Sequence, residues 1–406
     1  MRMSPAEPLP AANGLAAPDP RRILDRRGLG LLACSHVVDD LYQGAVPAIL
    51  PFLVLGRGYS YAAAAGITLA ATIASSVAQP AFGLLADRRS LPWLPPLSLL
   101  VAGGGIALVG LGSSYWWVWA AVALSGLGVA AYHPSAARAA RVASGASAQG
   151  MSWFAVGGNI GIALGPILAT PLLLALGLGG TPLLFLPALA MASVLALATA
   201  RGGAARPGRA TAKPAAPTDR PDDWRSFAWL TGLVVARSVA YFGLATMLAL
   251  YVIRRFHANE ATGSAALTVF LLAGACSTVP GGWLADRLGR VRTIRIGYAL
   301  LLPALLLLLW APATGVAIVA AALLGVAVYL PFSVQTTLGQ DYLPNRVGTA
   351  SGVTLGLAVA SGGVLAPAFG VVADQFGLHT ALAVLLVLSP LALLVSRKLP
   401  EPRHLA

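Results

Sequence analysis

Long apolar stretches recur along this chain, and they constrain its fold more than any other feature. A helix needs about 20 mostly apolar residues to cross a bilayer, where its backbone groups must be bonded within the helix. Only 10% of the residues are charged, against about 25% in soluble proteins. Twelve apolar stretches can be marked, at roughly 29–55, 61–86, 92–112, 115–140, 149–177, 181–200, 226–253, 260–286, 291–311, 313–341, 348–374 and 377–396. We therefore predict an all-α membrane protein with twelve transmembrane helices.

The basic residues are distributed unevenly among the segments that connect these stretches. The chain has 27 Lys and Arg residues and a formal net charge of +13. If the N-terminus is cytoplasmic, all but four lie in cytoplasmic segments, the exceptions being Arg57, Arg237, Arg254 and Arg255. Cytoplasmic loops of membrane proteins carry such an excess. We therefore expect both termini in the cytoplasm, a multi-pass protein of the bacterial inner membrane, and no nucleic-acid partner.

Three sequence motifs occur twice at nearly the same offset. GLLADR at 83–88 resembles GWLADR at 282–287, and GVAAYHP at 128–134 resembles GVAVYLP at 325–331. GIALGP at 161–166 likewise resembles GGVLAP at 362–367. Repeated halves of this kind place a substrate site between them near the middle of the membrane. The duplication predicts two pseudo-symmetric six-helix bundles.

The predicted bundles determine the domain organisation. The N-terminal bundle covers 29–200 and the C-terminal bundle covers 226–396. A cytoplasmic linker rich in Ala, Pro and Arg joins them at 201–225. The remaining segments, 1–28 and 397–406, are predicted to be cytoplasmic tails.

The first apolar span contains four polar residues that share one helical face. They are His36, Asp39, Asp40 and Gln43, and positions separated by three, four or seven residues lie on the same side of a helix. An acid at the centre of a bilayer costs about 2.5 kcal/mol or more, so it faces a wet cavity, a partner or a proton path. One interpretation is a structural hydrogen bond between helices. We favour proton coupling by Asp40, Asp39 and His36, with Gln43 contacting the substrate.

Arg237 lies deep in the seventh span and is the only cation predicted inside the membrane, with Tyr241 one turn away. An arginine here attracts an anionic substrate or pairs with the acids of the first span, unless it only reaches a polar interface. His133 and Arg138 follow at the cytoplasmic end of the fourth span, where ordinary basic anchoring is the alternative. We take these four residues, together with Asn159 of the fifth span, as candidate substrate-binding residues.

Two further features are typical of moving parts. Gly161 and Gly165 recur at a spacing that allows close helix contact, and Pro166 adds a bend. Asp87 and Asp286 end the second span of each half and can hold the positive end of a neighbouring helix. Surface salt bridging is the alternative interpretation of these acids. We predict gating roles for Asp87, Arg88, Asp286, Arg287, Arg290, Gly161, Gly165 and Pro166.

No sequence pattern indicates a bound cofactor or a catalytic centre. The five His and two Cys residues do not cluster in the sequence, and neither lysine follows a glycine as in a phosphate-binding P-loop. We therefore expect no metal, no cofactor and no enzymatic activity. A proton gradient is the expected source of energy, and a monomer is expected.

Several motifs resemble the major facilitator superfamily over residues 29–396. GWLADRLGRVR at 282–292 is similar to the cytoplasmic loop signature of that superfamily, and GIALGP at 161–166 resembles its antiporter motif. SHVVDDLYQ at 35–43, the segment from Tyr132 to Gly145, and LPNRVGTASG at 343–352 resemble the fosmidomycin-resistance branch. The resemblance implies a proton-driven exporter, with Asp40, Arg138 and Arg237 at polar positions of the branch. The branch more usually has Asn at Asp39 and Lys at Arg237, and an arginine changes anion recognition.

These observations lead to one prediction and two alternatives. We predict a proton-coupled secondary transporter that exports a small anionic or amphiphilic compound, such as fosmidomycin, by alternating access. The first alternative is a proton-coupled uptake symporter for an organic anion or a sugar, against which the antiporter-like motif of the fifth span argues. The second is a receptor or membrane-bound enzyme without transport activity, against which the absence of catalytic clusters in the sequence argues.

Overall fold

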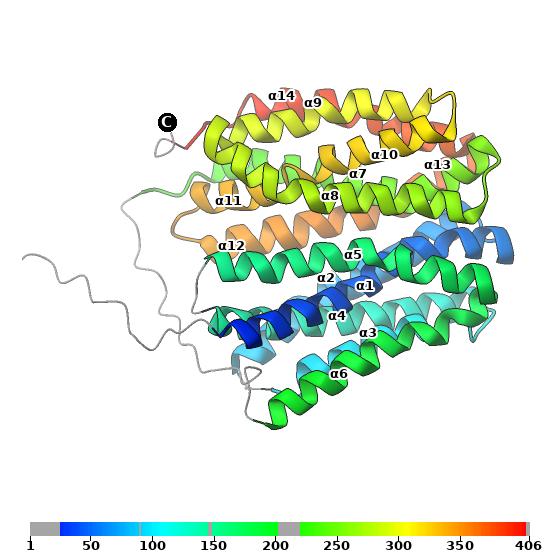
Figure 1. Ribbon diagram of the computed structural model, residues 1–406. Helices are drawn as coiled ribbons and strands as arrows, with labels where there is room; N and C mark the ends of the chain where they lie inside the picture. The colour runs from blue at the N-terminus through cyan, green and yellow to red at the C-terminus, as the bar shows by residue number, and fades with distance from the viewer. Residues whose placement is uncertain (1–24, 89–90, 145–147, 202–219, 403–406) are drawn as a thin grey trace, which may run out of the picture.

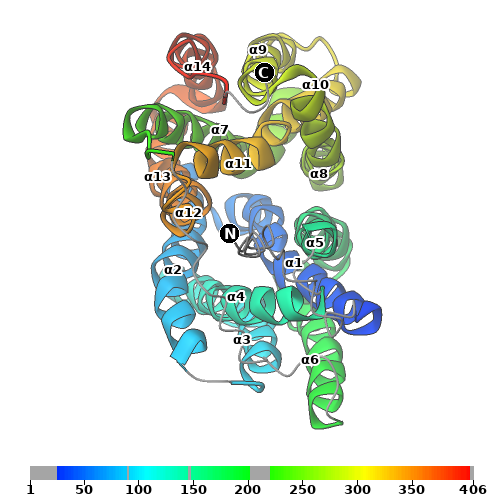
Figure 2. The same cartoon turned by 90° about the vertical axis from the view of Figure 1, so that its left-hand side faces the viewer.

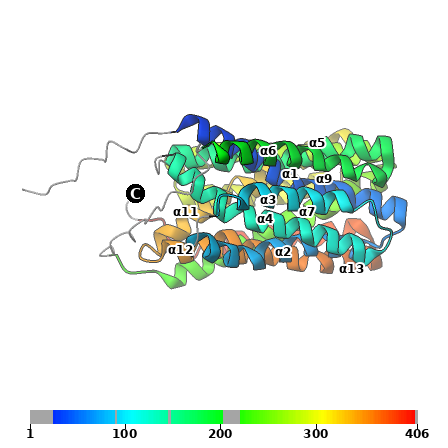
Figure 3. The ribbon, with the colours of Figure 1, turned by 90° about the horizontal axis from the view of Figure 1, so that it is seen from below.

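The computed structural model describes residues 25–88, 91–144, 148–201 and 220–402, and this part of the chain is helical without a strand. The first group of elements is α1 (Arg26–Arg57), α2 (Tyr61–Arg88), α3 (Leu94–Leu108), α4 (Tyr115–Ala143), α5 (Ala148–Leu176), η1 (Gly177–Leu184) and α6 (Phe185–Ala200). The second group is α7 (Trp224–Phe256), α8 (Glu260–Leu288), α9 (Arg290–Leu309), α10 (Thr314–Tyr329), α11 (Phe332–Tyr342), α12 (Val347–Ser351), η2 (Gly352–Leu357), α13 (Ala358–Ala383), η3 (Val384–Val387) and α14 (Leu388–Ser396). The long helices run along one common direction (Figures 1 and 3).

Within the described residues, nine helical runs are long and apolar enough to cross a membrane. Two of these runs, 151–200 and 347–396, contain 50 residues each, far more than one crossing needs. Each is interrupted by a glycine with a positive φ, Gly177 at 61° and Gly377 at 87°, a conformation that costs glycine little. The shorter helix α3 is also apolar. The prediction of an all-helical, multi-pass membrane protein is confirmed.

The first helix of each group begins in the same way. The Asp25 carboxylate accepts a hydrogen bond from Gly28 N at 2.9 Å, and that of Asp223 accepts one from Ser226 N at 3.0 Å. These caps satisfy backbone donors that have no partner within the helix. The Asp25 N–H also donates to Ala143 O, and the Asp223 N–H donates to Tyr342 O. The start of α1 is thereby joined to the end of α4, and the start of α7 to the end of α11.

The helices pack in two groups that Figure 2 shows one above the other, seen from the end where α1 begins and α14 ends. We call this the termini end, and the opposite end, where α1 gives way to α2, the far end. In the first group α1 packs along α5 and α2 on α4, and in the second α8 packs on α10 and α7 on α13. The two groups meet where α2 lies against α13 and α5 lies against α8.

Hydrogen bonds between the groups lie toward the far end. The backbone N–H groups of Tyr61 and Ala62, at the start of α2, donate to the two carboxylate oxygens of Asp374 at 2.8 and 2.9 Å. The hydroxyl of Thr246 donates to that of Thr68 at 3.3 Å, and the hydroxyls of Thr170 and Ser264 are also hydrogen-bonded. Asp374 therefore caps the N-terminus of a helix in the other group, where a negative charge is favourable.

Candidate functional site

The polar face of α1 is buried between α4 and α5 except at Gln43, which is exposed. Asp39 is 0% exposed, Asp40 is 5% exposed and His36 is 7% exposed. The helices approach closely because α5 carries glycines where it meets α1. A Cβ atom at Gly161 would collide with the carbonyl of Val37, and one at Gly165 would collide with the backbone of Gly44. The predicted close packing along these two glycines is therefore observed, and it places the α1 acids against α5.

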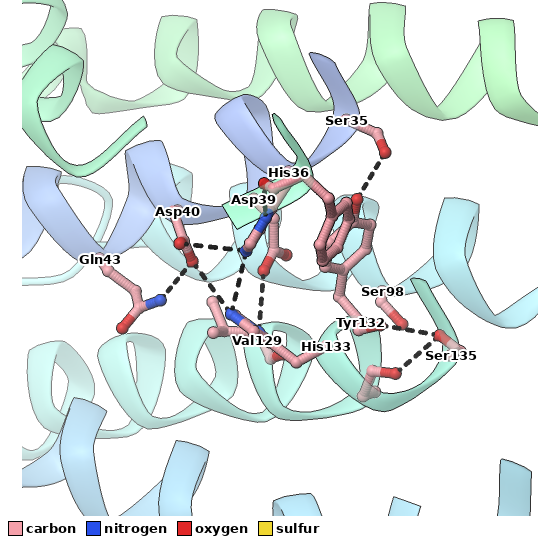
Figure 4. Close-up of polar contacts among 12 residues, drawn as sticks. Ser35, His36, Asp39, Asp40, Gln43, Ser98, Val129, Tyr132, His133 and Ser135 are labelled. Carbon is pink, nitrogen blue, oxygen red and sulfur yellow. Dashed lines mark hydrogen bonds and ion pairs between the residues drawn. The ribbon is translucent and has the colours of Figure 1, made fainter. Parts of the chain in front are cut away.

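His36, Asp40 and His133 form a compact cluster (Figure 4). Asp40 Oδ2 lies 3.3 Å from His36 Nε2, and Asp40 Oδ1 lies 3.3 Å from His133 Nε2. The two imidazole Nε2 atoms are 3.4 Å apart. The Gln43 amide donates to Asp40 Oδ1. We call His36, Asp40 and His133 the α1–α4 cluster.

Backbone carbonyls determine which ring nitrogens of the cluster carry hydrogen. His36 Nδ1 lies 2.8 Å from Phe154 O, and His133 Nδ1 lies 2.9 Å from Val129 O. A carbonyl oxygen only accepts, so both Nδ1 atoms are donors. In neutral imidazoles, both Nε2 atoms then present lone pairs to each other and to Asp40. A proton at either Nε2 atom provides a hydrogen-bond donor for the Asp40 carboxylate, and by distance alone the three side chains could also hold a metal ion.

Asp39 lies beside the cluster and is fully buried. Its Oδ2 atom is 3.4 Å from His133 Nδ1, but neither of its oxygens has a hydrogen-bond partner. The short distance is not a hydrogen bond, because the hydrogen on His133 Nδ1 is already donated to Val129 O. Asp39 is therefore in electrostatic contact with the cluster without being hydrogen-bonded to it.

Arg237 occupies a buried position on α7 in the second group. It is 5% exposed, and its Nε–H donates to Gln335 Oε1 at 3.0 Å. Its guanidinium carbon lies 4.7 Å from the centre of the Phe332 ring. Tyr241 and Tyr329 form an edge-on ring pair with centres 5.7 Å apart.

The remaining candidate substrate-binding residues lie outside the cluster. Arg138 is half-buried on α4 and donates to the carbonyl of Ala86. Asn159 is half-buried on α5. Arg138 therefore links α4 to the end of α2.

The charged candidate gating residues lie at the termini end, whereas Gly161, Gly165 and Pro166 lie within α5. The side chain of Asp87 lies outside the described residues, and Arg88 and Asp286 are exposed. The Arg287 guanidinium lies 4.2 Å from the centre of the Trp283 ring. Arg290 forms an ion pair with Asp341. This ion pair lies within the second group of helices.

Several functional candidates were not identified from the sequence. Gln335 and Tyr298, which hold Arg237 in place, are a polar pair in apolar spans. Polar side chains are rare inside membrane spans, so their presence there is the signal that could have identified these two residues. Asp374 joins the two groups at the far end. Glu401 accepts hydrogen bonds from the N–H groups of Arg290 and Val291 at the start of α9, and a lone acid in a basic tail gave no sign of this.

Gly158 provides a test of the cluster geometry. A Cβ atom there would lie 2.8 Å from His36 Nε2 and would collide with the Asp40 carboxylate. If the cluster carries a proton, as the sequence predicts, Gly158→Ala is expected to displace it and to lower the rate of substrate-coupled proton movement in proteoliposomes about tenfold or more, as small misplacements do in preorganised sites. Gly232→Ala is the matched control, because a Cβ atom there meets nothing within 4 Å. Equal rates in the two variants would contradict the geometry.

Comparisons with known proteins identify the family. A family model described as Major Facilitator Superfamily matches residues 32–367. The fosmidomycin resistance protein of Escherichia coli (strain K12) is 31% identical over 383 residues, which cover 93% of this chain and 93% of that protein. The uncharacterized MFS-type transporter YfnC of Bacillus subtilis (strain 168) is 29% identical, over 94% of this chain and 97% of its own.

A solved structure shares the fold. It is a bacterial homolog of the human lysosomal transporter Spinster in an inward-facing and occupied conformation, with a TM-score of 0.74 and 15% identity over 91% of this chain and 95% of that chain. At this identity the similarity shows the fold alone. The family match and the 31% identical relative go further: this chain is a transporter and not an enzyme, and it belongs to the Major Facilitator Superfamily, in the branch of the fosmidomycin resistance protein.

Proposed function

We propose that this transporter exports a small anionic or amphiphilic compound, such as fosmidomycin, in exchange for protons. The observation that carries the proposal is the pairing of two buried sites of opposite charge. One is the acid and histidine cluster on α1 and α4, and the other is the Arg237 guanidinium on α7. The 31% identity to a fosmidomycin resistance protein supports the choice of substrate.

The proposed topology has twelve membrane spans in two six-helix bundles, 29–200 and 226–396, joined by a cytoplasmic linker at 201–225. The 50-residue runs are divided at Gly177 and Gly377, which supports this count. Both termini are then cytoplasmic, the membrane is the bacterial inner membrane, and the working unit is a monomer. The hydrogen bonds between the groups at the far end support a conformation that faces the cytoplasm.

In the proposed cycle, Asp40 carries the proton with the help of Asp39 and His36, and Arg237 holds the anion. The proton on the Asp40 side and the anion on the Arg237 side change the same balance of charge between the two halves. Binding of one therefore favours release of the other. A proton entering and an anion leaving both move positive charge inward. Each such charge gains about 2.3 kcal/mol per 100 mV, and each unit of pH difference adds about 1.4 kcal/mol. No metal or cofactor has a step in this cycle.

The test uses purified protein in proteoliposomes with an acidic lumen. Fosmidomycin added outside is expected to raise the lumenal pH, because protons leave as the drug enters. A panel of anionic and cationic drugs then defines the range of substrates. Accumulation of an organic anion or sugar together with protons moving in the same direction would instead establish uptake, and the proposal would be wrong.

A further inference from the structure

Arg237 is a buried cation for which the structure provides no acidic partner among the described residues. Its Nε–H donates a hydrogen bond to Gln335, and its guanidinium lies over the face of Phe332. An unpaired buried charge is costly unless something compensates it. A buried guanidinium of this kind is suited to a ligand that brings the negative charge.

A chain of hydrogen bonds fixes the orientation of the Gln335 amide. The Tyr298 hydroxyl donates its only hydrogen to the carbonyl of Leu233, so it can only accept from Gln335 Nε2, 3.1 Å away. The amide nitrogen therefore faces Tyr298, and the amide oxygen must face Arg237. Gln335 is 1% exposed and Tyr298 is 2% exposed, so water does not compete for these bonds.

This orientation determines which edge of the guanidinium remains for a ligand. The Nε–H is occupied by Gln335 Oε1, and Phe332 lies over one face of the group. The end formed by the two Nη atoms remains, and it presents two parallel N–H bonds. Two such donors match two oxygen atoms on one centre, as in a carboxylate, a phosphonate or a phosphate.

We propose that Gln335 is a specificity-determining residue, which holds Arg237 so that the transporter accepts compounds with a two-oxygen anionic group. The inference rests on the proposed function and names the substrate class of that same site. Gln335 acts as a positioning residue because it acts on the ligand through Arg237. Tyr298 in turn positions Gln335.

The test measures ligand binding by the shift of the melting temperature of purified protein, which does not depend on transport. The probes are fosmidomycin, its neutral phosphonate diester, benzoate and inorganic phosphate. Gln335→Glu retains the shape of the side chain but places a carboxylate beside Arg237. We expect this variant to weaken binding of the anionic probes about 30-fold or more, the range for a buried charge whose partner is lost. Without ligand it should melt no lower than the wild type, because the new ion pair replaces the hydrogen bond.

Two further variants separate positioning from simple packing. Gln335→Met fills similar volume without an acceptor, and we expect a weaker loss of anion binding, with reduced discrimination between fosmidomycin and its diester. Tyr298→Phe frees the amide of Gln335 to turn over, and should produce a milder form of the same effect. Phe256→Leu, on α7 but far from Arg237, is the control for packing.

The outcomes distinguish the two proposals. If wild-type protein is stabilised by anionic probes and Gln335→Glu is not, the inference holds even when fosmidomycin produces no flux, and only the proposed function fails. If none of the anionic probes stabilises the wild type more than the neutral diester does, the inference is overturned. It is equally overturned if Gln335→Glu binds the anions as tightly as the wild type.

Discussion

Asp40→Asn is expected to abolish the rise in lumenal pH that fosmidomycin causes in acidic proteoliposomes. Asparagine has nearly the shape of aspartate and can still accept the hydrogen bond from Gln43, so the helices should pack as before. It cannot carry a negative charge or bind a proton at neutral pH. The two imidazole Nε2 atoms, 3.4 Å apart, then lose the carboxylate that faces both of them.

The control for this variant is Glu260→Gln, which removes an acid from the first turn of α8, away from the cluster. Drug flux without proton movement in Asp40→Asn would separate binding from coupling and would support the proposed division of labour between the two halves. Proton-coupled flux at the wild-type rate would show that Asp40 is not the proton carrier.

The sequence predicted the burial of three residues on the polar face of α1, though not the exposure of Gln43, because that prediction depends on helical spacing alone. Residues three or four apart share a face wherever the helix is located, and an intramembrane acid has to be buried away from lipid. The burial of His36, Asp39 and Asp40 agrees with this. The glycines of α5 were also informative, because small residues at regular spacing imply a close helix contact.

Contacts between helices could not be predicted in the same way. His133 was assigned to substrate binding, and the sequence did not indicate that its side chain lies against Asp40, on a helix remote in sequence. Its position depends on how closely α4 approaches α1, which no local pattern reports. Gln335 and Asp374 were missed for the same reason, since each acts on a helix remote in sequence.

The second large effect is expected at Arg237. Arg237→Gln removes the positive charge from the second half and should raise the KM for fosmidomycin export about 30-fold to 100-fold, because a buried charge-assisted hydrogen bond is lost. Arg237→Lys keeps the charge but has no planar fork and no Nε–H for Gln335. Its KM should lie between those of the wild type and Arg237→Gln, and its preference for two-oxygen anions should decrease. Initial rates over a range of drug concentrations separate KM from the maximal rate.

The comparison between Arg237→Gln and Asp40→Asn tests the mechanism more sharply than either variant alone. If proton and anion are bound in different halves, loss of Arg237 should weaken substrate binding while any drug that still moves remains coupled to protons. Loss of Asp40 should do the reverse, so that the drug is bound but no longer moves protons. Identical defects in both variants would mean that the two sites act as a single unit. In that case Tyr241, which lies on α7 one turn from Arg237 and packs edge-on against Tyr329, would be the residue to test next.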